Sequence, residues 1–141
     1  MPVRKADAQW QGDLKSGKGY MSLESGAYEG QFSFKTRFED GTGTNPEELI
    51  GAAHAGCFSM QFSAMLAEAG HTPDSVKTQA KVHFSVDGTP TIERIELITR
   101  GQVPGIEASE FEDIAAKAKQ ACPVSRLYQG AQIDLDAKLE N

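Results

Sequence analysis

The chain has 141 residues, enough for one domain with a sizeable core. Its formal net charge is -6, with 24% charged and 39% hydrophobic residues, and no basic run interrupts the acidic balance. This composition is typical of a globular protein and gives no electrostatic footprint for nucleic acid. Arg4, Lys5 and Asp7 occupy the place where a secretory signal would have its apolar stretch, so we expect a cytoplasmic protein.

The first forty residues predict short strands separated by turns. Apolar or small residues alternate with polar ones over residues 8–14, a Ser16-Gly17 turn leads to a second strand at 20–24, and phenylalanines alternate with polar residues over 32–38. An antiparallel meander is the simplest arrangement of these segments. Arg37 would then project from the third strand, on the side opposite the phenylalanines.

Residues 45–70 predict one long helix. Asn45 is a suitable N-cap, Pro46 suits the first helical position, Glu48 follows three residues after the cap, and Gly70 supplies a stop. Residues 49–67 carry no formal charge, and small or apolar side chains fall on every face. A helix of this kind is expected to be buried on all sides. Cys57, one of two cysteines, lies near its middle.

The uncharged stretch also has a length close to that of a membrane-spanning helix. Its 19 residues, 49–67, are at the lower edge of the length that crosses a bilayer. It contains His54, Gln61 and two serines, and the sequence has no second span. We therefore expect a buried core helix and no membrane partner.

The second half of the chain predicts a β-hairpin and two helices. Period-2 alternation over residues 76–86, a turn at 87–90 and a returning strand at 91–103 indicate the hairpin. Ser109 and Glu112 predict a capping box for an amphipathic helix, which leads to Cys122. Pro123 begins a further short helix, and residues 133–139 alternate as a last strand.

This order of elements predicts an α+β fold with antiparallel sheet, in a single domain spanning residues 1–141. One sheet and one amphipathic helix can cover only two sides of the long helix. We therefore expect a homodimer in which the long helix of each subunit packs against its partner.

Two segments, GTNPEELIGAAHAGCFSM and QACPVS, resemble the OsmC/Ohr family of thiol-dependent peroxidases, and VPGIEAS with CPVS resembles the OsmC branch. The similarity extends from residues 10–13 to the last strand. It implies antiparallel sheets wrapped around a long central helix, an intertwined homodimer, and reduction of organic hydroperoxides. Carried over by motif, the functional residues are Cys57, Cys122, Arg37 in KTRFED and Glu47 in NPEE. The residue before the first cysteine is commonly alanine in the family and is Gly56 here, a small change.

The chemistry of a thiol explains why an arginine belongs in such a set. Only the thiolate attacks a hydroperoxide, and at the ordinary pKa of about 8.5 only about 3% is ionised at pH 7. Burial raises the pKa further, so a cation is needed, and the guanidinium of Arg37 is permanently charged. A pKa of about 6 would make roughly 90% of Cys57 thiolate. Glu47 would hold Arg37 by a bidentate pair.

Helix geometry constrains how these residues meet. Glu47 and Cys57 are ten residues apart, so one straight helix would separate them by about 15 Å and place them on different faces. If the family's constellation holds, Arg37 and Glu47 of one subunit should serve Cys57 of the other.

The resemblance also implies the reaction cycle. Cys57 would become a sulfenic acid, Cys122 would condense with it to a disulfide, and an external dithiol, of lipoyl type by resemblance, would reduce that disulfide. No cofactor and no metal are expected. Apolar residues that could favour organic substrates include Phe58, Met60, Phe62 and Leu127.

The sequence is also compatible with two alternatives. The chain could be a non-enzymatic protein that binds apolar small molecules, with two cysteines that are structural or form a fixed disulfide. His54 and Cys57 could also form half of a zinc site with His83 and Cys122, although the last two lack the close ligand spacing of such sites.

Overall fold

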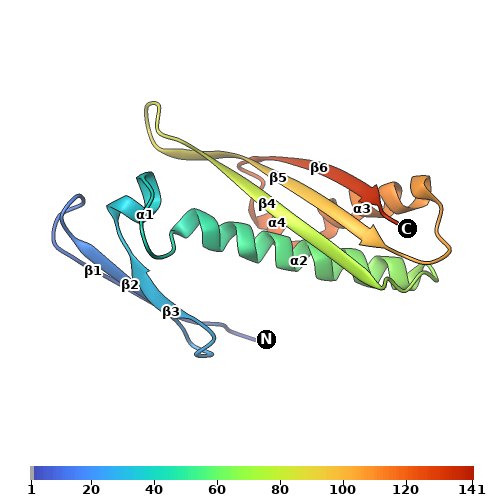
Figure 1. Ribbon diagram of the computed structural model, residues 1–141, viewed down its shortest axis with the longest axis horizontal. Coiled ribbons are helices and arrows are strands. Elements are labelled where there is room, and N and C mark those ends of the chain that lie inside the picture. The colour runs from blue at the N-terminus through green and yellow to red at the C-terminus, as the bar shows by residue number, and fades with distance from the viewer. Residues whose placement is uncertain (1) are drawn as a thin grey trace. The chain divides into compact units, whose positions relative to one another are not determined.

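The structure, a computed structural model, describes residues 2–141 and contains two three-stranded sheets. Contacts along the chain divide it into two units, one ending at Leu49 and the other comprising Ile50–Asn141. Each unit holds one of the sheets. Figure 1 shows the elements of both units in chain order.

The first unit contains the predicted antiparallel meander. It consists of β1 (Ala6–Gln11), β2 (Lys18–Leu23) and β3 (Glu29–Phe32), in that order across the sheet. Trp10 on β1 packs against Phe32 on β3, with ring centroids 5.4 Å apart.

The expectation that the third strand continues to residue 38 is wrong. The chain leaves the sheet after Phe32 and forms α1 (Phe34–Phe38). Ser33 and Thr36 form a capping box, in which Ser33 Oγ accepts the Thr36 N–H and Thr36 Oγ1 accepts the Ser33 N–H. These two bonds satisfy donors at the start of a helix, so the local capping signal prevails over the alternation of phenylalanines. Arg37 therefore lies on a helix.

The long helix, α2 (Pro46–Glu68), begins and ends as its capping signals predict. Asn45 Oδ1 accepts the Glu48 N–H at 2.8 Å. At the other end Gly70 adopts a φ of +91°, a value that favours glycine. The His71 N–H donates to the Leu66 carbonyl and the Gly70 N–H to that of Ala67, which together form a Schellman motif.

The second unit contains β4 (Ser75–Ser85) and β5 (Thr91–Gln102), which form the predicted antiparallel hairpin. The third strand, β6 (Gln132–Leu139), pairs with β5 in parallel, so this sheet is mixed and the expectation of purely antiparallel sheet is wrong here. The helices α3 (Ala108–Ala121) and α4 (Pro123–Leu127) lie between β5 and β6 in the chain. They form the crossover connection that parallel strands require.

The predicted capping box at the start of α3 is also absent. The helix begins one residue before Ser109, and its N-cap, Glu107, makes no side-chain capping hydrogen bond. The amphipathic pattern of the helix is nevertheless as predicted, since Phe111, Ile114 and Ala118 are buried.

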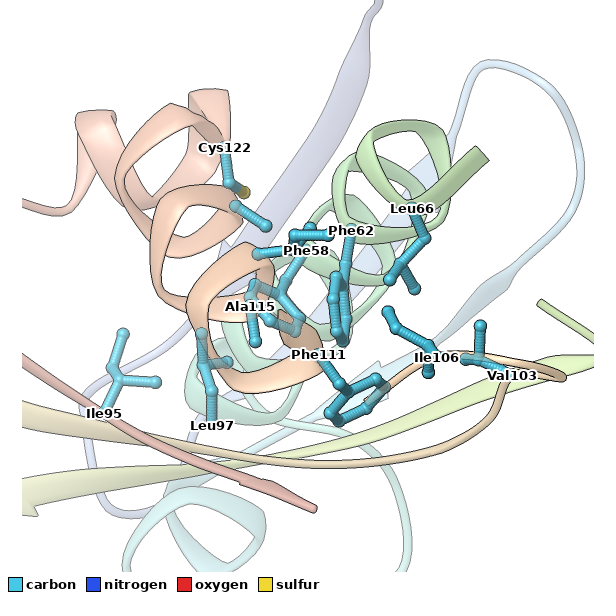
Figure 2. Packing of buried hydrophobic residues seen from close by; sticks show 12 residues of the cluster. Phe58, Phe62, Leu66, Ile95, Leu97, Val103, Ile106, Phe111, Ala115 and Cys122 are labelled. Carbon is cyan, nitrogen blue, oxygen red and sulfur yellow. The ribbon is translucent and has the colours of Figure 1, made fainter. Parts of the chain in front are cut away.

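The core of the second unit lies where α2 and α3 pack against one face of the β4-β5-β6 sheet (Figure 2). Phe62 of α2 meets Phe111 of α3 with ring centroids 4.9 Å apart. Gly101 on β5 makes room for this ring, because a Cβ at that position would lie 2.6 Å from Phe111. The core residues are Phe58, Phe62, Leu66, Ile95, Leu97, Val103, Ile106, Phe111, Ile114, Ala115, Ala118 and Cys122.

Within a single chain α2 is buried on one face only, and not on every side as the sequence suggests. Its buried positions from residue 51 onward recur at helical spacing: Gly51, His54, Phe58, Phe62 and Leu66. Uncharged residues on the remaining surface are exposed, and Met60 is 77% exposed. By length and composition α2 is also the one helix among the described residues that could cross a membrane, a test that core helices pass as well.

Candidate active site

The two cysteines lie side by side. Cys57 comes from the middle of α2 and Cys122 from the junction of α3 and α4, 65 positions later in the chain. Their Sγ atoms are 3.1 Å apart, and both thiols are free. Cys122 is completely buried, whereas Cys57 is partly exposed. A reagent that reaches this pair from solvent would therefore meet Cys57 first.

The backbone around Cys122 fixes the position of its sulfur. Cys122 is at once the C-cap of α3 and the N-cap of α4. Its N–H donates to the Ala118 carbonyl at 2.9 Å, and its own carbonyl accepts the Arg126 N–H at 3.0 Å. Pro123 suits the first position of α4 because it needs no hydrogen-bond acceptor there. Figure 2 shows Cys122 at the end of α3, beside the core residues of α2.

The surroundings of Cys57 in its own unit disfavour the thiolate. Burial raises the pKa of the Cys57 thiol, and the neighbouring Cys122 thiol raises it further. The backbone N–H of Val124 acts in the opposite direction and does not compensate. Efficient attack on a peroxide therefore requires a positive charge near Cys57.

Arg37 and Glu47, both in the first unit, form an ion pair. Arg37 Nε and Nη2 both donate to Glu47 Oε1, at 3.0 and 2.8 Å. The predicted pair thus forms with two N–H donors, although both converge on one carboxylate oxygen. The side chain of Glu47 is only 10% exposed, and Oε2 is buried without a hydrogen-bond partner among the described residues. Arg37 is 38% exposed, so solvent can reach its guanidinium.

A short network brings these two residues together. The side chain of Asn45 uses both of its polar ends: Oδ1 caps α2, and Nδ2 donates to the Thr36 carbonyl in α1 at 2.8 Å. Thr44 Oγ1 donates to Glu48 Oε1 at 3.0 Å. These bonds fix α1 against the first turn of α2, and Arg37 consequently faces Glu47.

An apolar pocket of about 290 Å³ lies beside Arg37 in the first unit. Aromatic rings dominate its wall, and Arg37 is its one charged lining residue. Such a pocket suits an apolar group that carries a polar end. Its lining residues are Trp10, Leu14, Phe32, Ser33, Phe34, Arg37, Phe38 and Pro46.

Two of the apolar residues that the sequence proposed for substrate binding have a different role. Phe58 and Phe62 are fully buried and pack in the core, so they do not line an accessible site. Met60 and Leu127 are exposed on the surface of the single chain.

The sequence also suggested a zinc site, which the geometry does not support. Among residues 2–141 no group of three or more His, Cys, Asp or Glu side chains is placed to hold a metal ion. His83 pairs with Glu96, at 2.6 Å. His54 lies 2.7 Å from Ser125, through Nε2 and Oγ, and its ring meets Tyr128 edge-on. This contact was not predicted, because the chain gives no local signal for it.

The four residues singled out by the sequence thus form two pairs, one in each unit. The structure brings Cys57 to Cys122 and Arg37 to Glu47. The structure describes each pair within its own unit. The assignment of all four residues to one active site stays a prediction.

Comparison with known proteins gives a consistent result. Residues 39–137 match the model of the family described as OsmC-like protein. The chain is 52% identical over 140 residues to peroxiredoxin OsmC of Escherichia coli K12, covering 98% of this chain and 97% of that protein. It is 33% identical over 96 residues to an organic hydroperoxide resistance protein of Xanthomonas axonopodis pv. citri, covering 64% and 63%.

Solved structures share the fold. An organic hydroperoxide resistance protein from Elizabethkingia anophelis matches with a TM-score of 0.74 at 23% identity, over 99% of this chain and 98% of that one. An OsmC-like protein of unknown function from Vibrio cholerae matches with a TM-score of 0.78 at 14% identity, over 97% and 99%. From the family match and the near full-length similarity to peroxiredoxin OsmC, we conclude that this chain belongs to the OsmC-like protein family.

Proposed function

We propose that the protein is a thiol-dependent peroxidase that reduces organic hydroperoxides to alcohols, with Cys57 as the attacking thiol and Cys122 as the resolving thiol. The observation that carries the proposal is the 3.1 Å contact between two free thiols, one partly exposed and one buried. Its 52% identity to a peroxiredoxin supports the reaction class. The alternative of an apolar-ligand binder would account for this contact by a fixed disulfide, whereas the two thiols are free.

The cycle has three steps. The Cys57 thiolate attacks the outer oxygen of the hydroperoxide, the O–O bond breaks, and the alcohol leaves with a proton while Cys57 becomes a sulfenic acid. The Cys122 sulfur then forms a bond to the Cys57 sulfur, and the sulfenic oxygen leaves as water. An external dithiol, of lipoyl type, reduces the disulfide by exchange. This cycle needs no metal and no bound cofactor.

Arg37 supplies the positive charge that the Cys57 thiolate requires. Burial raises the pKa of Cys57, so the family role of the arginine is chemically necessary here. Glu47 orients the guanidinium through two hydrogen bonds to one oxygen. The same guanidinium can donate to the peroxide oxygens and stabilise the departing alkoxide.

The active protein is proposed to be an intertwined homodimer in which each chain, residues 1–141, forms one OsmC-like domain. Glu47 and Cys57 are ten residues apart, and a straight helix would separate them by about 15 Å along its axis. The Arg37-Glu47 pair of one subunit would then serve Cys57 of the other. The exposed uncharged surface of α2 is suited to burial between two copies. It comprises Ala52, Ala53, Gly56, Met60, Ala64 and Ala67.

The apolar pocket beside Arg37 supports a preference for organic hydroperoxides. An alkyl or aryl substituent would occupy its aromatic wall, while the hydroperoxide group would face the guanidinium. Hydrogen peroxide has no substituent to fill this pocket, so it would gain no binding energy from it. A cytoplasmic enzyme of this kind would serve in the antioxidant stress response.

Titration of free thiols tests the proposed function. Reduced protein is treated with one equivalent of cumene hydroperoxide or, for comparison, hydrogen peroxide. Loss of both thiols, reversal by a dithiol, and no loss in Cys57→Ser are expected. Unchanged thiols in the unsubstituted protein would exclude the peroxidase.

Subunit complementation tests the shared site. Arg37→Ala and Cys57→Ser chains are each expected to be inactive as homodimers, whereas a mixed dimer has one site with both groups intact. It should recover activity at that site. A mixed dimer that assembles and stays inactive would contradict the sharing of residues between subunits.

A further inference from the structure

The short helix α4 depends on its neighbours for its position. It has five residues, Pro123–Leu127, far fewer than a helix needs to be stable by itself in water. His54 of α2 contacts Ser125 within α4 and Tyr128, the C-cap of α4. His54 Nε2 lies 2.7 Å from Ser125 Oγ, and the imidazole ring meets Tyr128 edge-on, with centroids 5.5 Å apart.

This contact is buried from solvent. His54 is completely buried and Ser125 is 4% exposed. The other ring nitrogen of His54, Nδ1, is buried without a hydrogen-bond partner among the described residues. Displacement of α4 from α2 would break the hydrogen bond between His54 and Ser125. The hydrogen bond therefore opposes displacement of α4 from α2.

The reacting sulfurs belong to the same two segments: Cys57 lies on α2, and Cys122 is the N-cap of α4. Cys57 follows His54 by three residues on α2, and Ser125 follows Cys122 by three residues at α4. Residues three apart on a helix lie on the same face. The His54-Ser125 hydrogen bond and the Cys57-Cys122 contact thus lie next to each other and join the same two segments of the chain.

We propose that His54 and Ser125 are positioning residues that keep Cys122 against Cys57 for disulfide formation, an inference that rests on the proposed peroxidase function. In this step the Cys122 sulfur donates an electron pair to the Cys57 sulfur and the S–O bond of the sulfenic acid breaks. The departing hydroxide takes the Cys122 proton and leaves as water. Cys57 is reduced from the sulfenic to the disulfide level as Cys122 is oxidised.

Positioning matters because a second reaction competes for the sulfenic acid. Another hydroperoxide molecule can oxidise Cys57 to the sulfinic acid, a state that dithiols do not reverse. The fraction of enzyme that is inactivated in each turnover depends on the rate of oxidation to the sulfinic acid relative to the rate of disulfide formation. A slower condensation with Cys122 would lower, by the same factor, the hydroperoxide concentration that inactivates half of the enzyme.

Rapid-quench mass spectrometry of peptides containing Cys57 separates the two steps. Thiol, sulfenic acid trapped by dimedone, disulfide and sulfinic acid are quantified after mixing reduced protein with cumene hydroperoxide. In Ser125→Ala and His54→Leu, formation of the sulfenic acid should keep its rate within about twofold. Disulfide formation should be about five- to tenfold slower, the effect of one buried hydrogen bond, and sulfinic acid should accumulate.

Three further variants make the test specific. His54→Gln places a side-chain amide near the position of Nε2 and should restore disulfide formation. The double variant His54→Leu/Ser125→Ala should be little slower than either single variant, because both remove the same bond. Ser59→Ala is the matched control: Ser59 Oγ donates to Thr78 Oγ1 at 2.8 Å and links α2 to β4 instead of α4. It should leave the ratio of the two rates unchanged.

The outcomes distinguish this inference from the proposed function. If Cys57 of the unsubstituted protein is not oxidised, the peroxidase is excluded and the positioning role falls with it. If Cys57 is oxidised normally and Ser125→Ala forms the disulfide at the unsubstituted rate, only the positioning role is overturned. Equal slowing of both steps, or equal slowing in Ser59→Ala, would also overturn it. Ser125→Ala removes a single oxygen and keeps the test valid if His54→Leu does not fold.

Discussion

Replacement of Arg37 by methionine should abolish most of the thiolate at Cys57. Burial and the Cys122 thiol raise the pKa of Cys57 above its ordinary value, and within its own unit no cation offsets this. At an unshifted pKa of about 8.5 the thiolate is about 3% of the thiol at pH 7, and burial lowers that fraction further. An opposite charge close to a titrating group typically shifts its pKa by about 1–3 units, so the guanidinium would favour the thiolate. Its removal should therefore lower the fraction of thiolate at pH 7 by about tenfold or more.

The pH dependence of alkylation by iodoacetamide measures this change directly. All proteins carry Cys122→Ser, so that Cys57 is the one thiol that reacts. Arg37→Met should move the midpoint of the alkylation profile upward by about one to three pH units, the typical effect of a nearby opposite charge. Arg100→Met is the matched control. Arg100 also pairs with a carboxylate, that of Asp136, but both residues lie on the sheet of the second unit. An Arg37→Met profile that coincides with the Arg100→Met profile would refute the role of Arg37.

Two other predictions concern stability and are tested by urea unfolding. Burial lowers the pKa of His54 below its ordinary value of 6.5. Below pH 6.5 the unfolded chain therefore binds a proton at His54 that the folded chain does not bind. The free energy of unfolding should decrease as the pH falls from 6.5, and His54→Gln should make this decrease smaller. Gly101→Ala should cost about 1–3 kcal/mol because its Cβ would meet the Phe111 ring, whereas Gly130→Ala, where a Cβ meets nothing within 4 Å, should not. An unchanged or steeper decline with His54→Gln, or equal losses at the two glycines, would contradict the prediction concerned.

The elements that the sequence predicts well are those with strong local signals. Asn45 and Gly70 bound α2 as their capping chemistry requires, and Pro123 begins α4. The β4-β5 hairpin follows from alternation along β4 and the turn residues that come after it. In each case the information lies within a few residues of the feature, so no knowledge of distant contacts is needed.

The errors arise where two local signals compete or where the answer is not local. The alternation of phenylalanines suggested a strand through Arg37, but the Ser33-Thr36 capping box starts α1 there. The direction of β6 depends on the path of α3 and α4 across the sheet, which no residue of β6 encodes. The uncharged composition of α2 predicted burial on all sides. Composition does not show which faces of the helix residues of the same chain cover.

The site shows the same division. Resemblance to a family suggested Cys57, Cys122, Arg37 and Glu47, and bare composition would not have selected them. The contact of the two sulfurs joins residues 65 positions apart, and that of His54 with Ser125 joins residues 71 apart. Contacts at such separations depend on how the helices pack, so only a structure can reveal them.

The stoichiometry of a single turnover tests the central proposal most directly. Reduced protein is mixed with less than one equivalent of cumene hydroperoxide, and the alcohol formed is compared with the disulfide mapped by peptide mass spectrometry. We predict one intrachain Cys57-Cys122 disulfide for each molecule of alcohol, with no alcohol formed by Cys57→Ser. Alcohol without this disulfide, or no reaction of the reduced protein, would contradict the assignment of the two cysteines as the redox pair.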